Sequence, residues 1–568
     1  MKKTLDLTTV VTPDNLAQQI ARKWQEWDSL RQGWKQEKRE LRNYIYATDT
    51  RTTANARLPW SNSTTTPKLC QIYDNLKANY TAALFPQDKW MKWEGNDRDG
   101  VSKQKAEIIE AYLYDKIRNS DFMRTADRLV DDYILFGNCF ATVSYEVDIV
   151  EAEEPVLAYM GPRLERISPY DIVFDPTAAS FTDTPKIIRS IVTLGVARKM
   201  IGDEAFDKML HARDEVGSAT SVDKADGYIA DGFSSIEHYY GSGYVEILTF
   251  YGDIYDVYEK TYKESAKITI ADRAYIVSDE KISSWLGRAP VFHAGWRSRP
   301  DNLYAMGPLD NLVGMQYRID HLENLKADVM DQIALPMLKV RGEVEDFDYQ
   351  PGERIFMGEE GDVGYLAPDA TALQADFQIA TLENKMEELA GAPRQAMGIR
   401  TPGEKTAFEV QTLATSASRI FEHKAAKLEQ EFIEPVLNAM LEAGRRNIDT
   451  SDLIRVFDSE TGIFLFENIT REDIQAKGKI RPVGARHFAE KARRVQNLQA
   501  LQMAKQDPAV AVHLSGKVTA EILAEELGEP KLFGENIAIK EQLETQQQMQ
   551  DAEVDNVDRL AAQEELGV

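Results

Sequence analysis

The chain has 568 residues, of which 43% are hydrophobic and 28% charged, so it can build large cores and is not a disordered polymer. Its 93 acidic residues outnumber its 67 basic residues and give a formal net charge of -26. Since DNA-binding proteins normally neutralise phosphates with a basic face, this balance excludes a protein that grips DNA with its whole surface.

The N-terminal part of the chain predicts long helices. Apolar residues recur there at spacings of three, four or seven and include Trp24, Trp27 and Trp34 on one stripe. This stripe indicates a helix that faces a core or a subunit interface, and both interpretations stay open. The third helix is expected to end at Gly137, because glycine is favoured just past a helix C-terminus. The predicted helices cover about residues 13–45, 67–84 and 102–136, and a polar loop covers about 48–66.

A β-rich region follows over about residues 138–300, where short segments rich in β-branched and aromatic residues alternate with Gly, Pro and Asp. Two helical insertions near 195–212 and 300–334 bracket much of this region. Beyond it, the sequence predicts a helix over 308–334, short strands and turns over 337–375, a helix over 376–397, a very long helix from 406 to about 445, a strand pair near 452–457 and 463–467, and a helical remainder over 486–568 with a Gln-rich acidic tail.

The segment Gly398–Thr406 resembles a phosphate-binding loop in the spacing of its two glycines. In a GxxxxGK[ST] loop the lysine follows the second glycine directly and reaches the nucleotide phosphates. Here Glu404 separates Gly403 from Lys405 and places negative charge where phosphates would lie. The preceding segment is also predicted to be a helix and not a strand. We therefore do not expect this segment to bind a nucleotide.

The same segment is better interpreted as a loop that leads into a helix. Thr406 and Glu409 form a T-x-x-E capping box. Pro435 falls inside the helix and is expected to kink it. Arg400 and Lys405 are either part of a solvated turn or cations that a protruding loop offers to a passing polyanion, and this choice stays open.

Residues 343–369 form a strongly acidic segment. The default interpretation is a solvated surface, and the alternative is the acidic wall of a DNA channel, where repulsion keeps DNA from adhering. The carboxylates do not follow an EF-hand pattern, so no metal site is predicted. The acidic residues proposed for this segment are Glu343, Glu345, Asp346, Asp348, Glu353, Glu359, Glu360 and Asp362, with Asp369 beyond them.

No feature of the sequence indicates an enzyme. The seven histidines form no HExxH or HxxxH pair, and there is no GxSxG motif. Cys70 and Cys139 sit in no CxxC pair, and a reduced, intracellular place of synthesis is expected. The sequence holds no run of 18 apolar residues, so no transmembrane helix is expected. We therefore predict no catalytic residues, no cofactor, no metal and no membrane partner.

Several short motifs follow one another in order between about residues 55 and 445. They are Pro59-Trp60-Ser61-Asn62-Ser63, Leu84-Phe85-Pro86, Asp132-Tyr133-Ile134-Leu135-Phe136-Gly137-Asn138, Ile167-Ser168-Pro169-Tyr170-Asp171, Tyr304-Ala305-Met306-Gly307-Pro308-Leu309, and the run from Arg400 to Glu409. In this order they resemble the portal, or head-to-tail connector, proteins of tailed phages, especially the short-tailed type. The chain departs from that pattern at Ala305-Met306, where relatives often carry Gly-Arg.

The resemblance implies an α+β portal fold and a ring, usually of twelve subunits, at one capsid vertex. Such a ring is a passive channel for packaging and ejection of the double-stranded phage DNA, and a docking platform. Its expected partners are the large terminase subunit, the major capsid or scaffold protein, and the tail adaptors. The protein would be made in the host cytoplasm and reside in the virion. The remaining hypotheses are another structural virion protein, such as an adaptor or scaffold, and a DNA-packaging ATPase.

The resemblance also implies a division of the chain into parts. These are N-terminal helices and a β-rich wing over 1–307, a first stem helix over 308–336, a small β clip over 337–375, a second stem helix over 376–397, a tunnel loop over 398–406, a long kinked helix with a return to the wing over 407–485, and a helical crown with an acidic tail over 486–568.

Overall fold

The chain forms two compact units, Met1–Ala485 and Arg486–Val568, and the described residues all belong to the first. The predicted helical crown therefore lies outside the described residues. The computed structural model describes residues 9–10, 16–46, 62, 64–86, 90–96, 105–150, 156–216, 244–256, 260–273, 275–345, 354–366, 370–390, 420–448, 452–457 and 464–484.

The first predicted helix is divided into α1 (Leu16–Leu30) and α2 (Gln32–Tyr46), with a turn at Arg31. The Arg31 guanidinium is buried and donates hydrogen bonds to the carbonyl oxygens of Pro169 and Ile172, at 2.6 and 2.8 Å, as well as to Asp28. Since these acceptors satisfy the buried charge, the position of the break follows from contacts with distant residues. The prediction of one uninterrupted helix is wrong at this residue.

The tryptophan stripe of α1 and α2 faces cores within the unit. Trp24 and Trp27 are buried against strands of the largest sheet, while Trp34 lies 5.4 to 6.1 Å from the rings of Phe136, Tyr170 and Tyr304. Of the two interpretations of this stripe, the core-facing one is therefore confirmed.

The main hydrophobic core gathers around helices α3 (Lys68–Leu84), α5 (Ala106–Asn119), α6 (Phe122–Leu135) and α14 (Glu434–Asn447). The helix predicted over 102–136 is thus two helices. It breaks at Ser120, whose extended backbone ends α5 before Asp121 leads into α6. Ser and Asp favour such boundaries because their side chains compete for backbone hydrogen bonds.

The strands form one large sheet and several smaller ones, so the α+β class is confirmed. The largest sheet has the order β5-β6-β7-β8-β9, with β1 paired in parallel to β7, and a second sheet has the order β10-β3-β4. Their bounds are Thr9–Val10 (β1), Asn138–Val150 (β3), Val156–Ile167 (β4), Ile172–Phe174 (β5), Lys186–Thr193 (β6), Tyr244–Asp256 (β7), Thr261–Ala271 (β8), Tyr275–Lys281 (β9) and Val291–Gly295 (β10).

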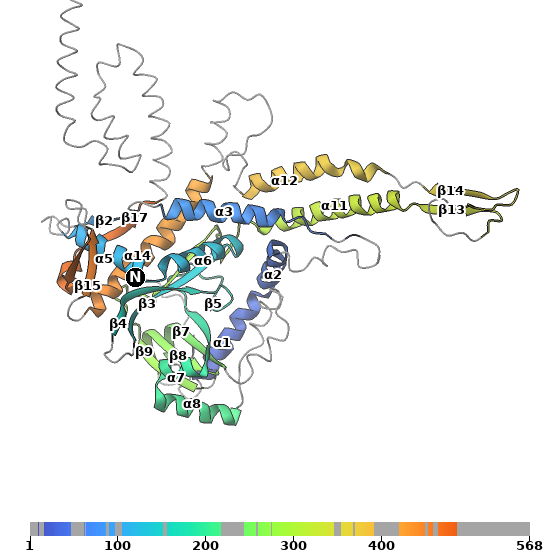
Figure 1. The fold of residues 1–568 in the computed structure, drawn as a ribbon. Helices are drawn as coiled ribbons and strands as arrows, with labels where there is room; N and C mark the ends of the chain where they lie inside the picture. The colour runs from blue at the N-terminus through green and yellow to red at the C-terminus, as the bar shows by residue number, and fades with distance from the viewer. Residues whose placement is uncertain are drawn as a thin grey trace, which may run out of the picture. The chain divides into compact units, whose positions relative to one another are not determined.

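Short elements complete the described unit (Figure 1). They are β2 (Met91–Gly95), α7 (Leu194–Ile201), α8 (Asp203–Val216), β11 (Arg297–Arg299), β12 (Asn302–Met306), β15 (Asp452–Phe457), β16 (Phe464–Ile469), α15 (Arg471–Ile474) and β17 (Gly478–Pro482). The strand pair predicted near 452–457 and 463–467 is present as β15 and β16, and β17 pairs with β2.

The long helix is distorted just before Pro435. Residues 420–428 are helical, a π-helical turn covers Glu429–Ile433, and α14 begins at Glu434 with Pro435 in its first turn. A proline inside a helix cannot donate its backbone hydrogen bond and crowds the carbonyl group four residues earlier, and a widened turn relieves both problems. The predicted distortion therefore takes the form of a π-helical turn. The start of this helix, before residue 420, lies outside the described residues.

The junction between α6 and β3 is held by a buried asparagine. The Asn138 side-chain amide donates to the carbonyl oxygens of Phe136 and Ala305, at 3.0 and 2.9 Å, and its oxygen accepts from the Ala305 N–H at 2.9 Å. Gly137 has a φ of 70°, and a Cβ there would collide with the backbone of Gly307. These contacts tie the end of α6 to the segment that leads into the next long helix.

That next helix, α11 (Val313–Ala334), follows a short 3₁₀ turn at Asp310–Leu312. Asp310 accepts from the Gly307 N–H at 2.8 Å and forms an ion pair with Lys38, whose side chain is buried. Burial lowers the pKa of Lys38, although the charge of Asp310 opposes this shift. The start of α11 is therefore fixed to α2 by a buried charge pair.

One side of α11 binds an extended segment, which we call the strap: Asn62 together with residues 64–67. The strap approaches polar side chains that recur every four residues on α11, so they share one face of the helix. The donors and acceptors are Asn62 N to Asp328 (2.6 Å), Thr64 N to Asn324 (2.8 Å), Thr66 N to Asp320 (3.0 Å) and, just beyond the strap, Leu69 N to Gln316 (3.2 Å).

The strap contacts are partly buried and reciprocal at their centre. Asn324 donates back to the Thr64 carbonyl oxygen at 3.0 Å, and Gln316 donates back to the Thr66 carbonyl oxygen at 2.6 Å. Burial raises the pKa of Asp320 to about 6, against the lowering effect of the hydrogen bonds from Thr66 and Gln316. Part of the polar loop predicted over 48–66 is therefore an ordered segment that is hydrogen-bonded to α11.

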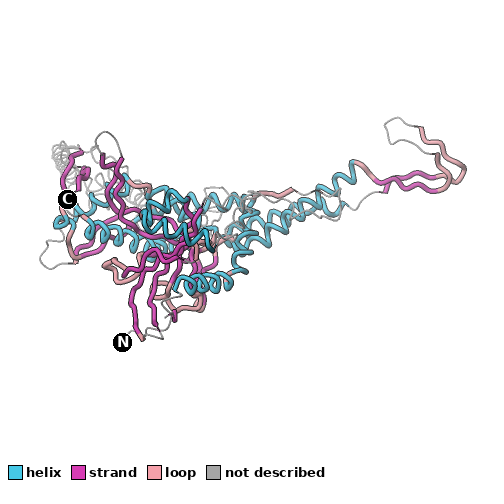
Figure 2. The backbone as a smooth tube through the Cα atoms, turned by 90° about the horizontal axis from the view of Figure 1, so that it is seen from below, coloured by secondary structure: helices cyan, strands magenta, loops and turns pink. Residues whose placement is uncertain are grey.

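Helix α12 (Asp376–Ala390) runs beside α11, and both lead away from the cores to a hairpin of β13 (Met337–Arg341) and β14 (Asp362–Leu366) (Figures 1 and 2). A buried ion pair of 2.6 Å joins Lys68 of α3 to Glu387 of α12. A second pair, Lys326–Asp376, joins α11 to α12 at 2.5 Å. The helices predicted over 308–334 and 376–397 correspond to α11 and α12, and residues 391–397 lie outside the described part.

We predict that Asn138→Ala destabilises the unit. The substitution leaves buried backbone groups of Phe136 and Ala305 without partners, so the free energy of unfolding should fall by roughly 3 kcal/mol. Urea unfolding of the purified chain measures this change. The control is Asn311→Ala at an exposed position, which should alter stability by less than about 0.5 kcal/mol. Equal effects of the two substitutions would contradict the assigned role.

A second prediction concerns the strap. Asn324→Ala removes three hydrogen bonds to Thr64, so the backbone amide of Thr64 should exchange with solvent at least about tenfold faster, equivalent to some 1.4 kcal/mol. Hydrogen exchange read out on peptides that contain residues 62–66 measures this. Arg318→Ala, on an exposed face of α11, is the matched control, and unchanged exchange in Asn324→Ala would refute the strap contacts.

Candidate functional site

Most residues of the hairpin at the end of α11 and α12 are exposed to solvent. Met337 pairs with Leu366 at one end of the ladder and Arg341 with Asp362 at the other. The pairing extends beyond the strands through a bridge between Val344 and Met357. A two-stranded sheet is only marginally stable in water by itself, so this hairpin needs further contacts.

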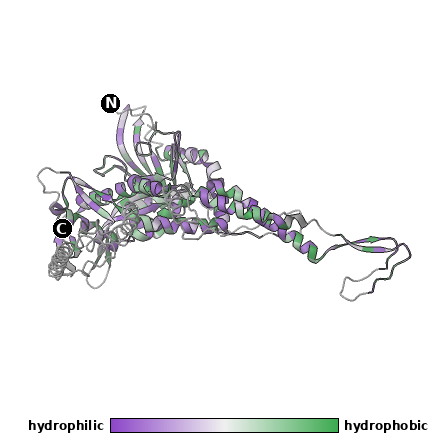
Figure 3. Ribbon diagram, turned by 90° about the horizontal axis from the view of Figure 1, so that it is seen from above, coloured by the Kyte–Doolittle hydropathy of each residue, from purple (hydrophilic) through white to green (hydrophobic). Residues whose placement is uncertain are grey.

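Apolar side chains cover both strands and the segment before β14. Figure 3 shows hydrophobic positions interspersed with hydrophilic ones along the two helices and the hairpin. Met337, Phe356 and Tyr365 are 63%, 65% and 66% exposed. We call the following exposed residues the apolar hairpin surface: Met337, Val340, Phe356, Met357, Tyr365 and Leu366.

The apolar exposure continues onto the helices. Phe377 at the start of α12 is 81% exposed, and Leu335 at the end of α11 is 72% exposed. Met330 and Ile333 on α11 are also exposed. Many exposed apolar side chains on neighbouring elements, as here, are typical of sites of protein–protein contact.

Carboxylates lie among these apolar residues. The described members of the predicted acidic set are all exposed, and no ion pair joins them to a cation within the described residues, although Arg341 lies opposite Asp362 in the ladder. Lys339, Arg341 and Arg354 are the basic residues of the described hairpin, so its acidity is moderate. The described members are Glu343, Glu345, Glu359, Glu360 and Asp362, whereas Asp346, Asp348, Glu353 and Asp369 lie outside the described residues.

The turn that carries Glu343 is shaped by glycine. Gly342 has a φ of 79°, and a Cβ there would collide with the backbone of Glu360. The N–H of Gly358 donates to the Glu343 carbonyl oxygen at 3.0 Å. The backbone around these carboxylates is therefore closely paired, although their side chains face solvent.

The segment Gly398–Thr406, with Arg400 and Lys405, lies outside the described residues, as does the capping box at Thr406 and Glu409. Sequence reasoning singled out charges and missed the apolar hairpin surface. The signal was present in the run Ile355-Phe356-Met357, three adjacent apolar residues within an acidic segment.

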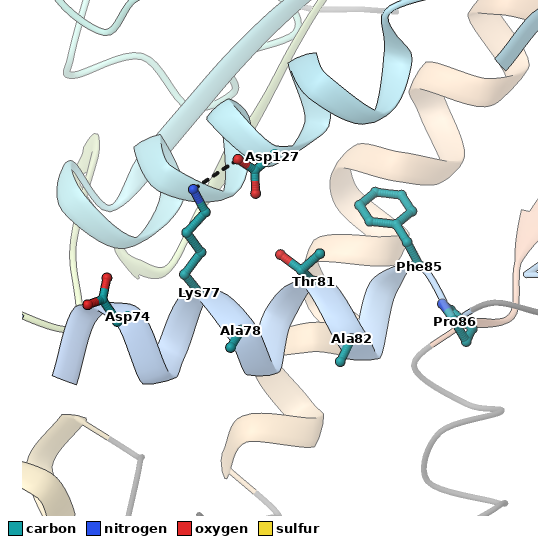
Figure 4. Close-up of a pocket in the computed structure, with 8 residues that line it drawn as sticks. All are labelled: Asp74, Lys77, Ala78, Thr81, Ala82, Phe85, Pro86 and Asp127. Atoms are coloured by element: carbon teal, nitrogen blue, oxygen red, sulfur yellow. Dashed lines mark ion pairs between the residues drawn. The ribbon is translucent and has the colours of Figure 1, made fainter. Parts of the chain in front are cut away.

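A shallow groove of about 660 Å³ lies between α3 and α6 (Figure 4). Lys77 reaches across it to Asp127 at 2.9 Å and to Asp131 at 2.9 Å. Burial works to lower the pKa of Lys77, but these carboxylates raise it, so the lysine remains charged. Ala78, Ala82 and Phe85 supply the apolar part of the lining. The groove thus offers a satisfied ion pair and no activated nucleophile.

Among the described histidines, His293 has a shifted pKa and structural surroundings. His293 stacks on Phe140 at 4.7 Å between ring centres and lies 3.0 Å from the Asn138 side-chain oxygen. Burial lowers its pKa to about 3, assisted by the charges of Lys186 and Lys427, so the imidazole stays neutral. Within the described ranges, no three His, Cys, Asp or Glu side chains are grouped so as to hold a metal ion.

No helix in the described part of the chain combines the length and apolar character needed to cross a membrane.

Part of the chain is similar to a known protein family. A search of curated proteins finds no match to the chain. Residues 17–152, which run from α1 to the end of β3, match the family described as bacteriophage head to tail connecting protein. That family is structural, and the match confirms the resemblance drawn from the motifs. Over residues 17–152, the chain is therefore similar to the bacteriophage head to tail connecting proteins.

Proposed function

We propose that the protein is a portal: copies form a ring at one capsid vertex, and the ring is a channel for packaging and ejection of double-stranded DNA. The observation that carries this proposal is the apolar hairpin surface on α11 and α12. A monomer would leave this surface in water, whereas neighbours in a ring would cover it. In a ring every copy also offers one face to the copy before it and a different face to the copy after it.

In this proposal the parts of the chain have separate roles. Residues 138–300 with the N-terminal helices are the wing, α11 and α12 are the stem, and the hairpin within 337–375 is the clip. The segment 486–568 is the crown. Twelve copies are the expected number, and the protein resides in the virion after synthesis in the host cytoplasm.

The clip is proposed to face the large terminase subunit during packaging and the tail adaptors afterwards. Because neighbouring copies would cover the apolar hairpin surface, this contact would use the exposed carboxylates of the hairpin, such as Glu359 and Glu360. Its carboxylates repel phosphates, which keeps a partner surface free of bound DNA. The major capsid or scaffold protein would contact the ring elsewhere.

The channel mechanism is passive. The net charge of -26 disfavours tight binding of DNA, so the ring guides and retains DNA while a separate ATPase supplies work. Arg400 and Lys405 are proposed to make transient contacts with phosphates from the tunnel loop. No step in this mechanism requires catalysis or a cofactor.

Two other functions make different predictions. An adaptor or scaffold would also be a structural protein of the virion, but it would not form a ring with a central hole. A packaging ATPase would need a strand-linked phosphate loop, and Glu404 interrupts the only segment that resembles one. ATP hydrolysis by the purified chain would favour the ATPase.

We predict that the double variant Phe356→Ser, Tyr365→Ser weakens ring formation. Each aromatic side chain contributes roughly 2 kcal/mol when buried, so association of the copies should weaken at least tenfold. Sedimentation velocity and particle counts in electron micrographs measure the fraction of rings. Val196→Ser with Met200→Ser, two exposed residues of α7, is the matched control. If the hairpin variant still forms rings at the protein concentrations at which the wild-type chain does, the proposed interface is contradicted.

Charge reversal at Arg400 and Lys405 should impair DNA packaging or retention while rings still assemble. The substitutions would remove contacts with phosphates and would leave the described hydrophobic cores unchanged. DNA content of assembled heads is the measurement. The control reverses Arg198 and Lys208, exposed cations of α7 and α8. Failure of ring assembly in the loop variant would show that the loop is structural instead.

A further inference from the structure

Three cations converge on the end of β10 in a chain that is otherwise strongly acidic. Arg297 is exposed, and Lys424 and Lys427 are half-buried on the helix that covers residues 420–428. The lysines are three residues apart, so they project from the same side of that helix. We call Arg297, Lys424 and Lys427 the cation cluster.

The backbone of residues 295–298 organises the cluster. Lys424 donates to the Trp296 carbonyl oxygen at 2.5 Å, and Lys427 donates to the Gly295 carbonyl oxygen at 3.1 Å and the Ser298 hydroxyl at 2.9 Å. Lys424 and Arg297 also lie 4.5 and 5.0 Å from the centre of the Trp296 ring. The neutral oxygens around the two lysines thus use only part of their donor capacity, and Arg297 lies over the Trp296 ring.

The charge of the cluster is not balanced within the described residues. Its one ion pair joins Lys427 to Glu431 at 3.6 Å, and that carboxylate is half exposed. Burial lowers the pKa of Lys424, and repulsion from Lys427 and Arg297 lowers it further. An anion bound between these cations would relieve the repulsion.

The support beneath the cluster is rigid. The Trp296 side chain is 3% exposed, and its indole N–H donates to the Tyr80 hydroxyl at 3.0 Å. Its backbone N–H donates to the Gly137 carbonyl oxygen at 2.9 Å, next to the Asn138 junction. The lysines are therefore positioned before any ligand arrives, which lowers the entropic cost of binding.

We propose that the cation cluster is a contact site for the phosphates of double-stranded DNA, separate from the loop that carries Arg400 and Lys405. This proposal rests on the proposed function in one respect: the ring would enclose double-stranded DNA, which is the polyanion that the cluster would bind. Ammonium and guanidinium groups bind phosphate oxygens without reading bases, so the contact is independent of sequence and depends on salt. Three contacts per copy, repeated around a ring, would steady DNA without gripping it.

The test measures binding of a short double-stranded DNA to the purified full chain across a range of salt concentrations. In the triple variant Arg297→Gln, Lys424→Gln, Lys427→Gln, the slope of log affinity against log salt should decrease in magnitude by about 2 to 3, since each phosphate contact contributes about 0.9. The matched control removes the same charge elsewhere, at Arg198, Lys208 and Lys263, which are exposed and already paired with carboxylates. Lys424→Arg with Lys427→Arg should restore the slope.

Four outcomes decide the proposal, with electron microscopy of the same samples as the second measurement. A reduced slope in the triple variant alone, with rings intact, supports it. An unchanged slope in intact rings overturns it. Loss of rings in the triple variant alone also overturns it, because the cluster would then bind carboxylates of a neighbouring copy. If the wild-type chain forms no ring and the triple variant still has the reduced slope, the portal function fails and the phosphate site stands.

Discussion

The hydrogen bonds between the strap and α11 are the constraint on which the exposed hairpin depends. Gln316, Asp320 and Asn324 are buried polar side chains, and each would be costly without a partner. The backbone of the strap supplies those partners and so fixes the direction in which α11 leaves the core. The Lys68–Glu387 pair then holds α12 beside it. A hairpin that is marginal alone is thus presented at a defined place, as the proposed interface between copies requires.

Acidic and basic side chains gather on different parts of the described unit, which the net charge alone does not show. The hairpin exposes carboxylates such as Glu359 and Glu360 among apolar side chains, whereas the end of β10 collects Arg297, Lys424 and Lys427. An acidic protein that must touch DNA briefly gains from this separation: overall repulsion prevents adhesion, and a few fixed cations limit where contact occurs. The proposed DNA contacts thus agree with the composition that first argued against DNA binding.

Periodicity predicted much of the fold, and contacts between distant residues explain most of what it missed. The helix at 68–84, the β-rich region and α11 follow from local patterns. The break at Arg31 does not, because carbonyl groups of residues 169–172 satisfy its guanidinium. The strap looked like a polar loop, since its partners lie about 260 residues away. The acidic residues of the hairpin were visible in the sequence, but the exposure of Phe356 and Tyr365 was not, because burial depends on what covers a strand.

The central claim is that copies of this chain close into a ring through surfaces that a monomer would leave exposed. Electron microscopy of the purified protein tests it most directly. The account predicts hollow rings with a central hole, of one uniform subunit number. A population of monomers, or solid rods without a hole, would contradict it.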